Sequence, residues 1–143
     1  MPKIYRAMKR DEDGLPLVGP TREGLGVVPG DPPTGDIPVD DDRNVVPNTG
    51  GLSVAPSWRN LPPGRIPRRL RSVFGRARGS NRYCCWVMGD GEFEDGAVDA
   101  GLFFRRDKPT HGVVGPEQTT TFDDFQTCIA ATREQWQVIP EDQ

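Results

Sequence analysis

Histidine, cysteine and lysine are scarce in this chain of 143 residues. There is one histidine, His111, and there are three cysteines, of which Cys84 and Cys85 are adjacent and Cys128 lies far along the chain. A structural zinc site needs four ligands at short spacings such as Cys-x-x-Cys, and no such spacing is present. We therefore expect no metal centre, and we expect reduced thiols that fill the core, as is usual in the cytoplasm.

Long hydrophobic runs are missing as well. No run approaches the roughly 18 apolar residues that a membrane-spanning helix needs, and the first residues lack the apolar stretch of a signal peptide. The glycine patterns of dinucleotide-binding βαβ units and of P-loops are also missing. These absences predict a cytoplasmic protein without a membrane partner, and they exclude the two commonest nucleotide-binding motifs.

Glycine and proline are abundant. The chain has 17 glycines and 15 prolines, well above the roughly 12% that the two types make up in globular proteins. Three tryptophans, six phenylalanines and two tyrosines remain to build a core. The length fits a single domain over residues 1–143. We predict an α+β fold with a mixed or antiparallel β-sheet core, few helices and long Pro/Gly-rich loops.

Short apolar segments predict the strands. Residues 3–8 alternate, so that Ile4, Arg6 and Met8 share one face of a first strand, and Tyr5 and Ala7 share the other. Residues 82–88 form a continuous apolar run, which is typical of a buried central strand. Further strands are expected within 50–55, 101–106 and 110–114.

The C-terminal segment predicts the clearest helix. Thr121 is a candidate N-cap, and two aspartates follow in the first turn, where the helix dipole favours them. Apolar positions then recur every three or four residues as far as Trp136, with Pro140 beyond the end. One or two helical turns are also expected within residues 68–74. Residues 14–50 show no periodicity and predict either a long ordered loop or a flexible cover.

The basic residues are mostly arginine, 15 of 18, and seven of these arginines lie within residues 65–82. The simplest explanation of the arginine content is a GC-rich genome. We expect the stretch 65–82 to form a solvated face or to pair with Asp40, Asp41 and Asp42. An acidic protein partner is the next alternative. Nucleic acid is not the expected partner, because few aromatics are interleaved and the net charge is -3.

Three side chains are candidates for chemistry. His111 is the single imidazole, although a lone histidine is more often a hydrogen-bonded structural residue. Arg6 lies within a short strand, where an inward guanidinium needs a partner or an anionic ligand and an outward one would be solvated. Ser53 follows the pair Gly50-Gly51, whose backbone can approach a neighbour closely, but it lacks the glycine that a nucleophile elbow needs after its serine.

Four segments resemble, in order along the chain, a family of small bacterial effector toxins exported by type VI secretion, which have an ADP-ribosyltransferase-like fold. The resemblance covers most of the chain, although identical residues are few. The matching segments are Ile4-Tyr5-Arg6-Ala7, Asn48-Thr49-Gly50-Gly51-Leu52-Ser53-Val54, Asp107 with Thr110-His111 before Pro116, and Arg133-Glu134-Gln135-Trp136.

The resemblance implies a split β-sheet core that binds NAD as co-substrate in a cleft between two small sheets. It implies that Arg6, Ser53 and His111 are catalytic, with Arg6 holding the anionic part of NAD and His111 polarising a hydroxyl or contacting the ribose. Binding of NAD is assigned to Tyr5, Arg6, Gly50, Gly51 and Ser53. The implied enzyme is an NAD-dependent ADP-ribosyltransferase or NAD glycohydrolase.

The same resemblance implies a toxin that acts in the cytoplasm of a recipient cell, reached without a signal peptide, and that a cognate immunity protein neutralises. Two departures bear on activity. Leu52 stands where the family has a threonine, and the late glutamate that orients the ribose 2′-hydroxyl has no clear counterpart, since Glu117 matches no motif. The alternative is therefore a non-catalytic protein-binding module that uses the Arg-rich stretch 65–82.

Overall fold

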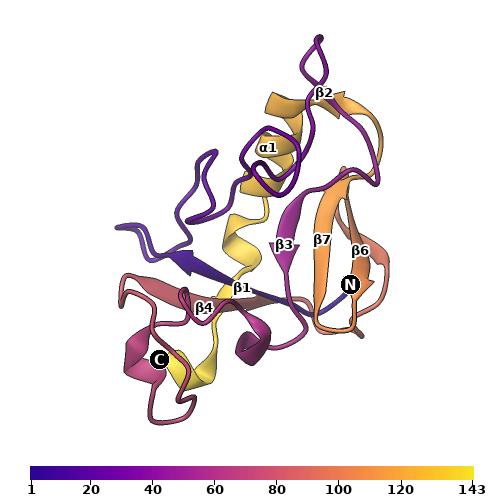
Figure 1. The fold of residues 1–143 in the computed structure, drawn as a ribbon. Helices are drawn as coiled ribbons and strands as arrows, with labels where there is room; N and C mark the ends of the chain where they lie inside the picture. Colours follow the sequence, from indigo (N-terminus) through magenta and orange to yellow (C-terminus); the bar gives the residue numbers. More distant parts are fainter.

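The computed structural model describes all 143 residues and shows an α+β fold of antiparallel sheets with one α-helix (Figure 1). A three-stranded sheet has the order β1 (Ile4–Lys9), β4 (Tyr83–Met88), β9 (Gln137–Val138). A four-stranded sheet has the order β3 (Leu52–Val54), β7 (His111–Pro116), β6 (Leu102–Lys108), β5 (Gly96–Asp99). A separate small pair joins β2 (Asn44–Val45) to β8 (Thr120–Thr121).

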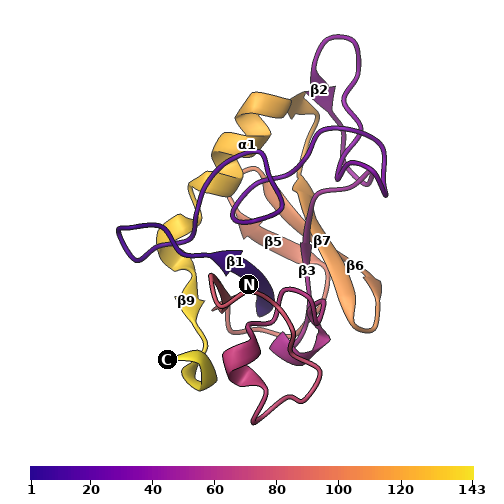
Figure 2. The ribbon, with the colours of Figure 1, turned by 60° about the vertical axis from the view of Figure 1, so that its left-hand side comes forward.

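The two larger sheets meet where β1 approaches the end of β3. The amide of Tyr5 donates to the carbonyl of Ala55 at 2.8 Å, and the amide of Ala55 donates back to Tyr5 at 3.0 Å. In Figure 1, β1 and β4 run crosswise to β3 and β7, and Figure 2 shows β1 against β3 from a second direction. This contact brings one edge of the four-stranded sheet against the backbone of β1.

The side chains of β1 alternate between two faces, as its sequence predicts, and each face packs against a different cluster of the hydrophobic core. Ile4 and Met8 face the larger cluster, which fills the space between the sheets and the helix. Ala7 faces the smaller cluster, together with Trp58 and Ile66 from the segment before β4. Strand β4 is the central strand of its sheet, so the prediction from the apolar run at 82–88 is also confirmed.

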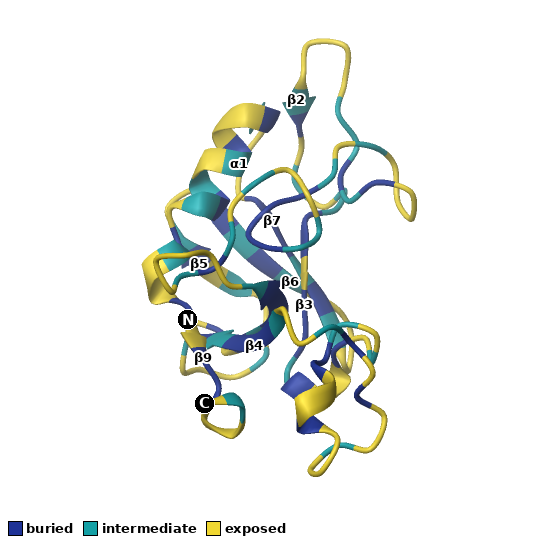
Figure 3. Ribbon diagram, turned by 90° about the vertical axis from the view of Figure 1, so that its left-hand side faces the viewer, coloured by how far each residue is buried: buried dark blue, intermediate teal, exposed yellow.

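The irregular segment between β1 and β3 is an ordered cover. Its Leu25, Val27, Ile37 and Val45 side chains are completely buried in the larger cluster. Figure 3 shows buried stretches interrupting the exposed loops. Of the two alternatives for residues 14–50, the ordered loop is the one observed, because spaced apolar side chains hold it on the core.

The C-terminal helix is shorter than predicted. Helix α1 (Phe122–Ala130) begins after the N-cap Thr121, whose hydroxyl accepts the amide of Asp124 at 3.1 Å. The predicted helix up to Trp136 ends early because a 3₁₀ turn follows and the chain then pairs with β4 as β9. Trp136 is nevertheless buried, and its indole N–H donates to the Thr132 hydroxyl at 3.0 Å.

Two 3₁₀ turns precede β4, Trp58–Asn60 and Arg68–Leu70. Of the one or two helical turns predicted within residues 68–74, one is observed, and it is a 3₁₀ turn. Cys84 and Cys85 are buried on opposite faces of β4, one in each cluster, as the core-filling role predicts. Burial raises the pKa of the Cys85 thiol to about 12. None of the helices has the length and hydrophobicity needed to cross a bilayer.

Candidate functional site

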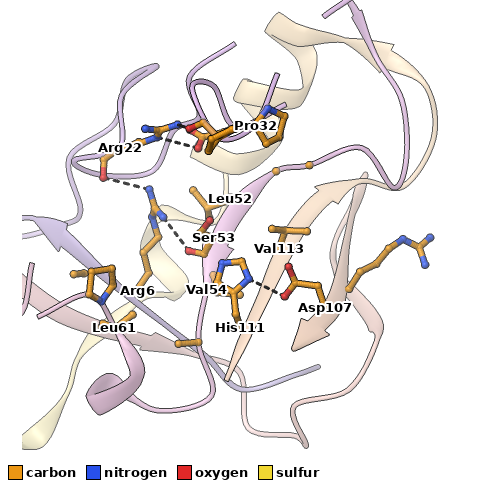
Figure 4. A pocket seen from close by; sticks show the side chains of 18 of the residues that line it. Arg6, Arg22, Pro32, Leu52, Ser53, Val54, Leu61, Asp107, His111 and Val113 are labelled. Carbon is orange, nitrogen blue, oxygen red and sulfur yellow. Dashed lines mark hydrogen bonds and ion pairs between the residues drawn. The ribbon is translucent and has the colours of Figure 1, made fainter. Parts of the chain in front are cut away.

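A cleft of about 790 Å³ opens beside the junction of the two sheets (Figure 4). Its walls come from β1, from β3, β6 and β7, and from the loops around residues 22–36, 48–51 and 60–65. The volume lies within the range of about 300–1,000 Å³ that is typical of small-molecule sites. The cleft contains Arg6, Ser53 and His111, which lie far apart in the sequence.

The cleft is strongly cationic. Five arginines line it, against two carboxylates, Asp36 and Asp107. The Asp36 carboxylate is already bound to Arg22 at 3.0 Å and to the amide of Val28 at 2.7 Å. The Asp107 carboxylate is bound to His111. The arginines are Arg6, Arg22, Arg65, Arg105 and Arg106. Such a surplus of guanidinium groups in a concave site attracts anions, and guanidinium geometry suits phosphate and carboxylate oxygens.

Arg6 points inward from β1 and is 6% exposed. Its guanidinium donates to the carbonyl oxygens of Gly24 at 3.1 Å, Ser53 at 2.9 Å and Arg22 at 3.4 Å. No carboxylate lies within 4.0 Å of it, so the charge is unpaired. Burial, with a smaller effect of Arg65, lowers the pKa of Arg6 to about 10. A buried cation of this kind is stabilised by an anion entering the cleft.

The other arginines of this wall are held to different degrees. Arg22 is fixed through Asp36 and through the carbonyls of Pro33 and Thr34, both at 3.0 Å. Arg65 donates to the carbonyl of Arg22, the same oxygen that accepts from Arg6. Two guanidinium groups therefore converge on one backbone oxygen, and their mutual repulsion is relieved by an anion between them.

Ser53 lies at the centre of β3, which is an edge strand. Leu52 and Val54 are buried, whereas the Ser53 side chain faces the cleft and is exposed. Ser53 is paired with Val113 of β7, and Val113 is paired in turn with Arg105 of β6. His111 lies two residues before Val113 and so shares its face of the sheet. The alternation of three strands thus brings Ser53, Arg105 and His111 together on one wall.

His111 is hydrogen-bonded to Asp107 across the hairpin of β6 and β7. The distance from its Nδ1 to the Oδ1 of Asp107 is 2.7 Å. The register of the two strands shifts between Arg106 and Lys108, and such irregularities re-aim side chains. Arg105, Arg106 and Asp107, which are consecutive in sequence, all line the cleft near this irregularity.

The glycine pair at the start of β3 is packed against protein backbone. A Cβ on Gly50 would lie 2.1 Å from the carbonyl oxygen of Asp36, and one on Gly51 would lie 2.2 Å from that of Val114. Both have positive φ, 149° and 154°. The close approach that the sequence predicts is therefore confirmed, and the neighbours are the cover loop and β7. Both glycines also line the cleft.

Tyr5 and Glu117 lie outside the cleft. Because side chains alternate along β1, Tyr5 points away from Arg6 and packs against the smaller core cluster. Glu117 follows the far end of β7, six residues from His111 and so about 20 Å away along the strand. No glutamate lines the cleft, so the late glutamate that the resemblance calls for has no counterpart there.

Of the two arrangements predicted for the Arg-rich stretch 65–82, the solvated face is observed, since most of its arginines are exposed. The alternative, ion pairing with Asp40, Asp41 or Asp42, is not observed. The Asp40 carboxylate accepts backbone amides within its own turn instead. Arg69 pairs with the fully buried Asp142 carboxylate at 2.7 Å.

Several cleft residues were not predicted as site residues: Arg22, Asp36, Arg65, Arg105, Arg106 and Asp107. The sequence holds a signal for Arg105, since the neighbouring predicted strands 101–106 and 110–114 favour a hairpin that places it beside His111. Arg22 and Asp36 lie in the aperiodic cover, where no pattern fixes their position.

No protein-family model matches the chain, and no curated protein or solved structure is significantly similar to it. No group of three or more histidine, cysteine, aspartate or glutamate side chains is placed to hold a metal ion.

Proposed function

We propose that this chain is a toxin with an ADP-ribosyltransferase-like fold that binds NAD in the arginine-lined cleft and cleaves its nicotinamide–ribose bond. The product would be an ADP-ribosylated target or, with water as acceptor, free ADP-ribose. The observation that carries the proposal is the convergence of Arg6, Ser53 and His111 on one cationic cleft. The toxin would act in the cytoplasm of a recipient cell and would be neutralised by a cognate immunity protein.

The residues present suit the anionic part of a dinucleotide. A diphosphate carries oxygens that can bridge the guanidinium groups of Arg6 and Arg65, which already share a backbone acceptor. Ser53 and His111 present hydrogen-bonding groups to ribose hydroxyls from the neighbouring wall. The cleft volume of about 790 Å³ is large enough for a ligand of this class.

The reaction needs stabilisation of an oxocarbenium-like transition state as neutral nicotinamide leaves. The chain's own contribution is to orient the ribose, to limit water in the cleft and to provide oriented dipoles and negative charge near the reacting carbon. The outward hydroxyl of Ser53 is the group on this wall that can supply an oriented dipole, whereas the Asp107 carboxylate is bound to His111. No glutamate of the cleft shares this task.

The test is growth of a bacterial host after induced cytoplasmic expression, with cellular NAD assayed. Ser53→Ala, His111→Ala and Arg65→Ala are suitable variants, because these side chains are not fully buried and their loss spares both core clusters. The matched control is Glu117→Gln, on an exposed residue outside the cleft. We expect wild type and control to arrest growth and lower NAD, and the cleft variants to do neither at equal protein level. A harmless wild type would contradict the proposal.

A second function is favoured by the surface of the stretch 65–82. Arg68, Arg76, Arg78 and Arg82 are exposed and have no carboxylate partner, and the chain has no acidic residue between Asp42 and Asp90. A non-catalytic module could bind an acidic protein through this face. Replacing Arg76, Arg78 and Arg82 by serine separates the two functions. It would abolish partner capture by a binding module, and it would leave growth arrest and NAD loss intact for a cleft enzyme.

A further inference from the structure

We propose that His111 and Asp107 form the proton-accepting pair of the cleft. His111 would take the proton from the hydroxyl or water that attacks the ribose, and Asp107 would be a positioning residue that holds the imidazole in the required tautomer. This inference rests on the proposed function and deepens it, because it names the group that activates the acceptor. Neither the sequence nor the resemblance assigned such a role to Asp107.

The hydrogen bond between the two side chains determines which imidazole nitrogen is free. A carboxylate oxygen accepts hydrogen bonds only, so the contact of 2.7 Å requires that Nδ1 of His111 carries the hydrogen. In the neutral ring Nε2 then keeps its lone pair. Histidine with a carboxylate on Nδ1 and a free Nε2 is the arrangement of a general base. Both residues line the cleft, and Figure 4 shows the pair beside Ser53 and Val113.

Apart from Asp107, whose carboxylate is bound to His111, the cleft offers no competing base. Its five arginines are donors only, and even Arg6, with its pKa lowered to about 10, stays protonated at neutral pH. Asp36 is occupied by Arg22 and by the amide of Val28. Ser53 is a hydroxyl, which needs a base to become a good nucleophile. His111 is therefore the group in the cleft whose free ring nitrogen is placed to accept a proton.

The step balances as follows. The bond between ribose C1′ and the pyridinium nitrogen of NAD breaks, and its electron pair leaves with nicotinamide, which becomes neutral. The oxygen of the acceptor forms a new bond to C1′ and loses its proton to Nε2 of His111. The imidazolium that results is stabilised by the Asp107 carboxylate. It returns the proton to solvent, and no oxidant or reductant is involved.

The positioning role can be measured without relying on activity, because His111 is the single histidine of the chain. Imidazole ¹⁵N chemical shifts of the labelled, purified protein report which ring nitrogen carries the hydrogen. We expect the Nδ1–H tautomer in wild type and in the Glu117→Gln control. In Asp107→Ala no side-chain oxygen remains to accept from Nδ1–H, so we expect a shift toward the Nε2–H tautomer.

Kinetics of nicotinamide release complete the test. We expect Asp107→Asn to lower kcat at least tenfold, with KM for NAD changed less than about twofold, and His111→Ala to lower kcat about 10²-fold or more. Since Asp107 acts through His111, adding Asp107→Asn to His111→Ala should cause no further loss. The proposal is overturned if Asp107→Asn causes the same loss of kcat in the wild-type and His111→Ala proteins, or if the tautomer is unchanged in Asp107→Ala. If wild type releases no nicotinamide while the tautomer shift is observed, the proposed reaction fails and the hydrogen-bonded pair stands as structure only.

Discussion

Replacement of Arg6 by methionine tests how the cover loop is held over the cleft. Methionine matches the unbranched stem of arginine, but it removes every N–H that Arg6 donates to the carbonyls of Gly24, Ser53 and Arg22. Two of these carbonyls belong to the cover and one belongs to the edge strand β3. The guanidinium therefore joins β1, the cover and β3 at one point, and its loss is expected to loosen their contact.

The size of the effect follows from two opposing contributions. The bonds at 3.1 and 2.9 Å have ordinary lengths, and each bond from a charged donor contributes about 1.5–3 kcal/mol, or about 3–6 kcal/mol together. The bond at 3.4 Å adds little. Burial of the charge opposes folding, and the lowered pKa of about 10 corresponds to about 3 kcal/mol. The midpoints of the two contributions, about 4.5 and about 3 kcal/mol, leave about 1.5 kcal/mol, so we expect Arg6→Met to lower the free energy of unfolding by about this amount and Tm by about 5 °C.

Urea and thermal unfolding followed by circular dichroism measure this change. Arg6→Lys is the matched control, because it keeps the buried charge while losing most of the hydrogen bonds, and we expect it to be less stable than Arg6→Met. Pyrophosphate should raise Tm of wild type more than that of Arg6→Met, since the ligand binds the folded state through the lost group. An Arg6→Met protein as stable as wild type would refute the assignment of these hydrogen bonds to the stability of the cover.

Three further predictions concern other parts of the fold. The hydrogen bond from the Leu15 amide, with a smaller effect of Arg133, lowers the pKa of Asp13. The stabilising effect of Asp13 is therefore present above its unfolded pKa and is lost as pH falls through its folded pKa. The Tm difference between wild type and Asp13→Asn should disappear in acid. Gly51→Ala should cost more than about 2 kcal/mol in urea unfolding, since its Cβ would meet a backbone oxygen at 2.2 Å, whereas Gly64→Ala, with open space around it, should be nearly neutral. In native protein at pH 8, a thiol reagent should label the half-buried Cys128 and leave Cys85, whose pKa is raised to about 12, unlabelled until the chain unfolds.

The sequence predicted the elements whose patterns are long enough to be periodic. The alternation around Arg6 and the apolar run ending at Met88 specify β1 and β4, because a buried strand needs one or two apolar faces over several residues. Strands β2, β8 and β9 have two residues each and carry no such pattern. The apolar spacing up to Trp136 predicts too long a helix. Trp136 is buried and keeps the helical spacing, but it lies at the end of the 3₁₀ turn that follows the helix.

The candidate site was predictable to the extent that it lies on strands. Ser53 and His111 share a wall because Ser53 of β3 is paired with Val113 of β7, and His111 lies on the same face of β7 as Val113. The resemblance implies that Tyr5 binds NAD, but side chains alternate along β1, so Tyr5 points to the face opposite Arg6. Arg22 and Asp36 come from the cover, whose path is fixed by isolated buried side chains rather than by any local signal.

Arg6 and the His111–Asp107 pair differ in what their substitution can reveal. Arg6 is buried and holds three segments together, so a loss of the proposed activity in its variants would combine altered folding with altered ligand binding. Ser53, Asp107 and His111 are exposed or half-buried on a wall whose backbone is fixed by the β3–β7 and β6–β7 ladders. Their removal leaves both core clusters intact. Variants of Ser53, Asp107 and His111 therefore report on the chemistry of the cleft alone. Variants of Arg6 report on it only when their free energy of unfolding has been measured as well.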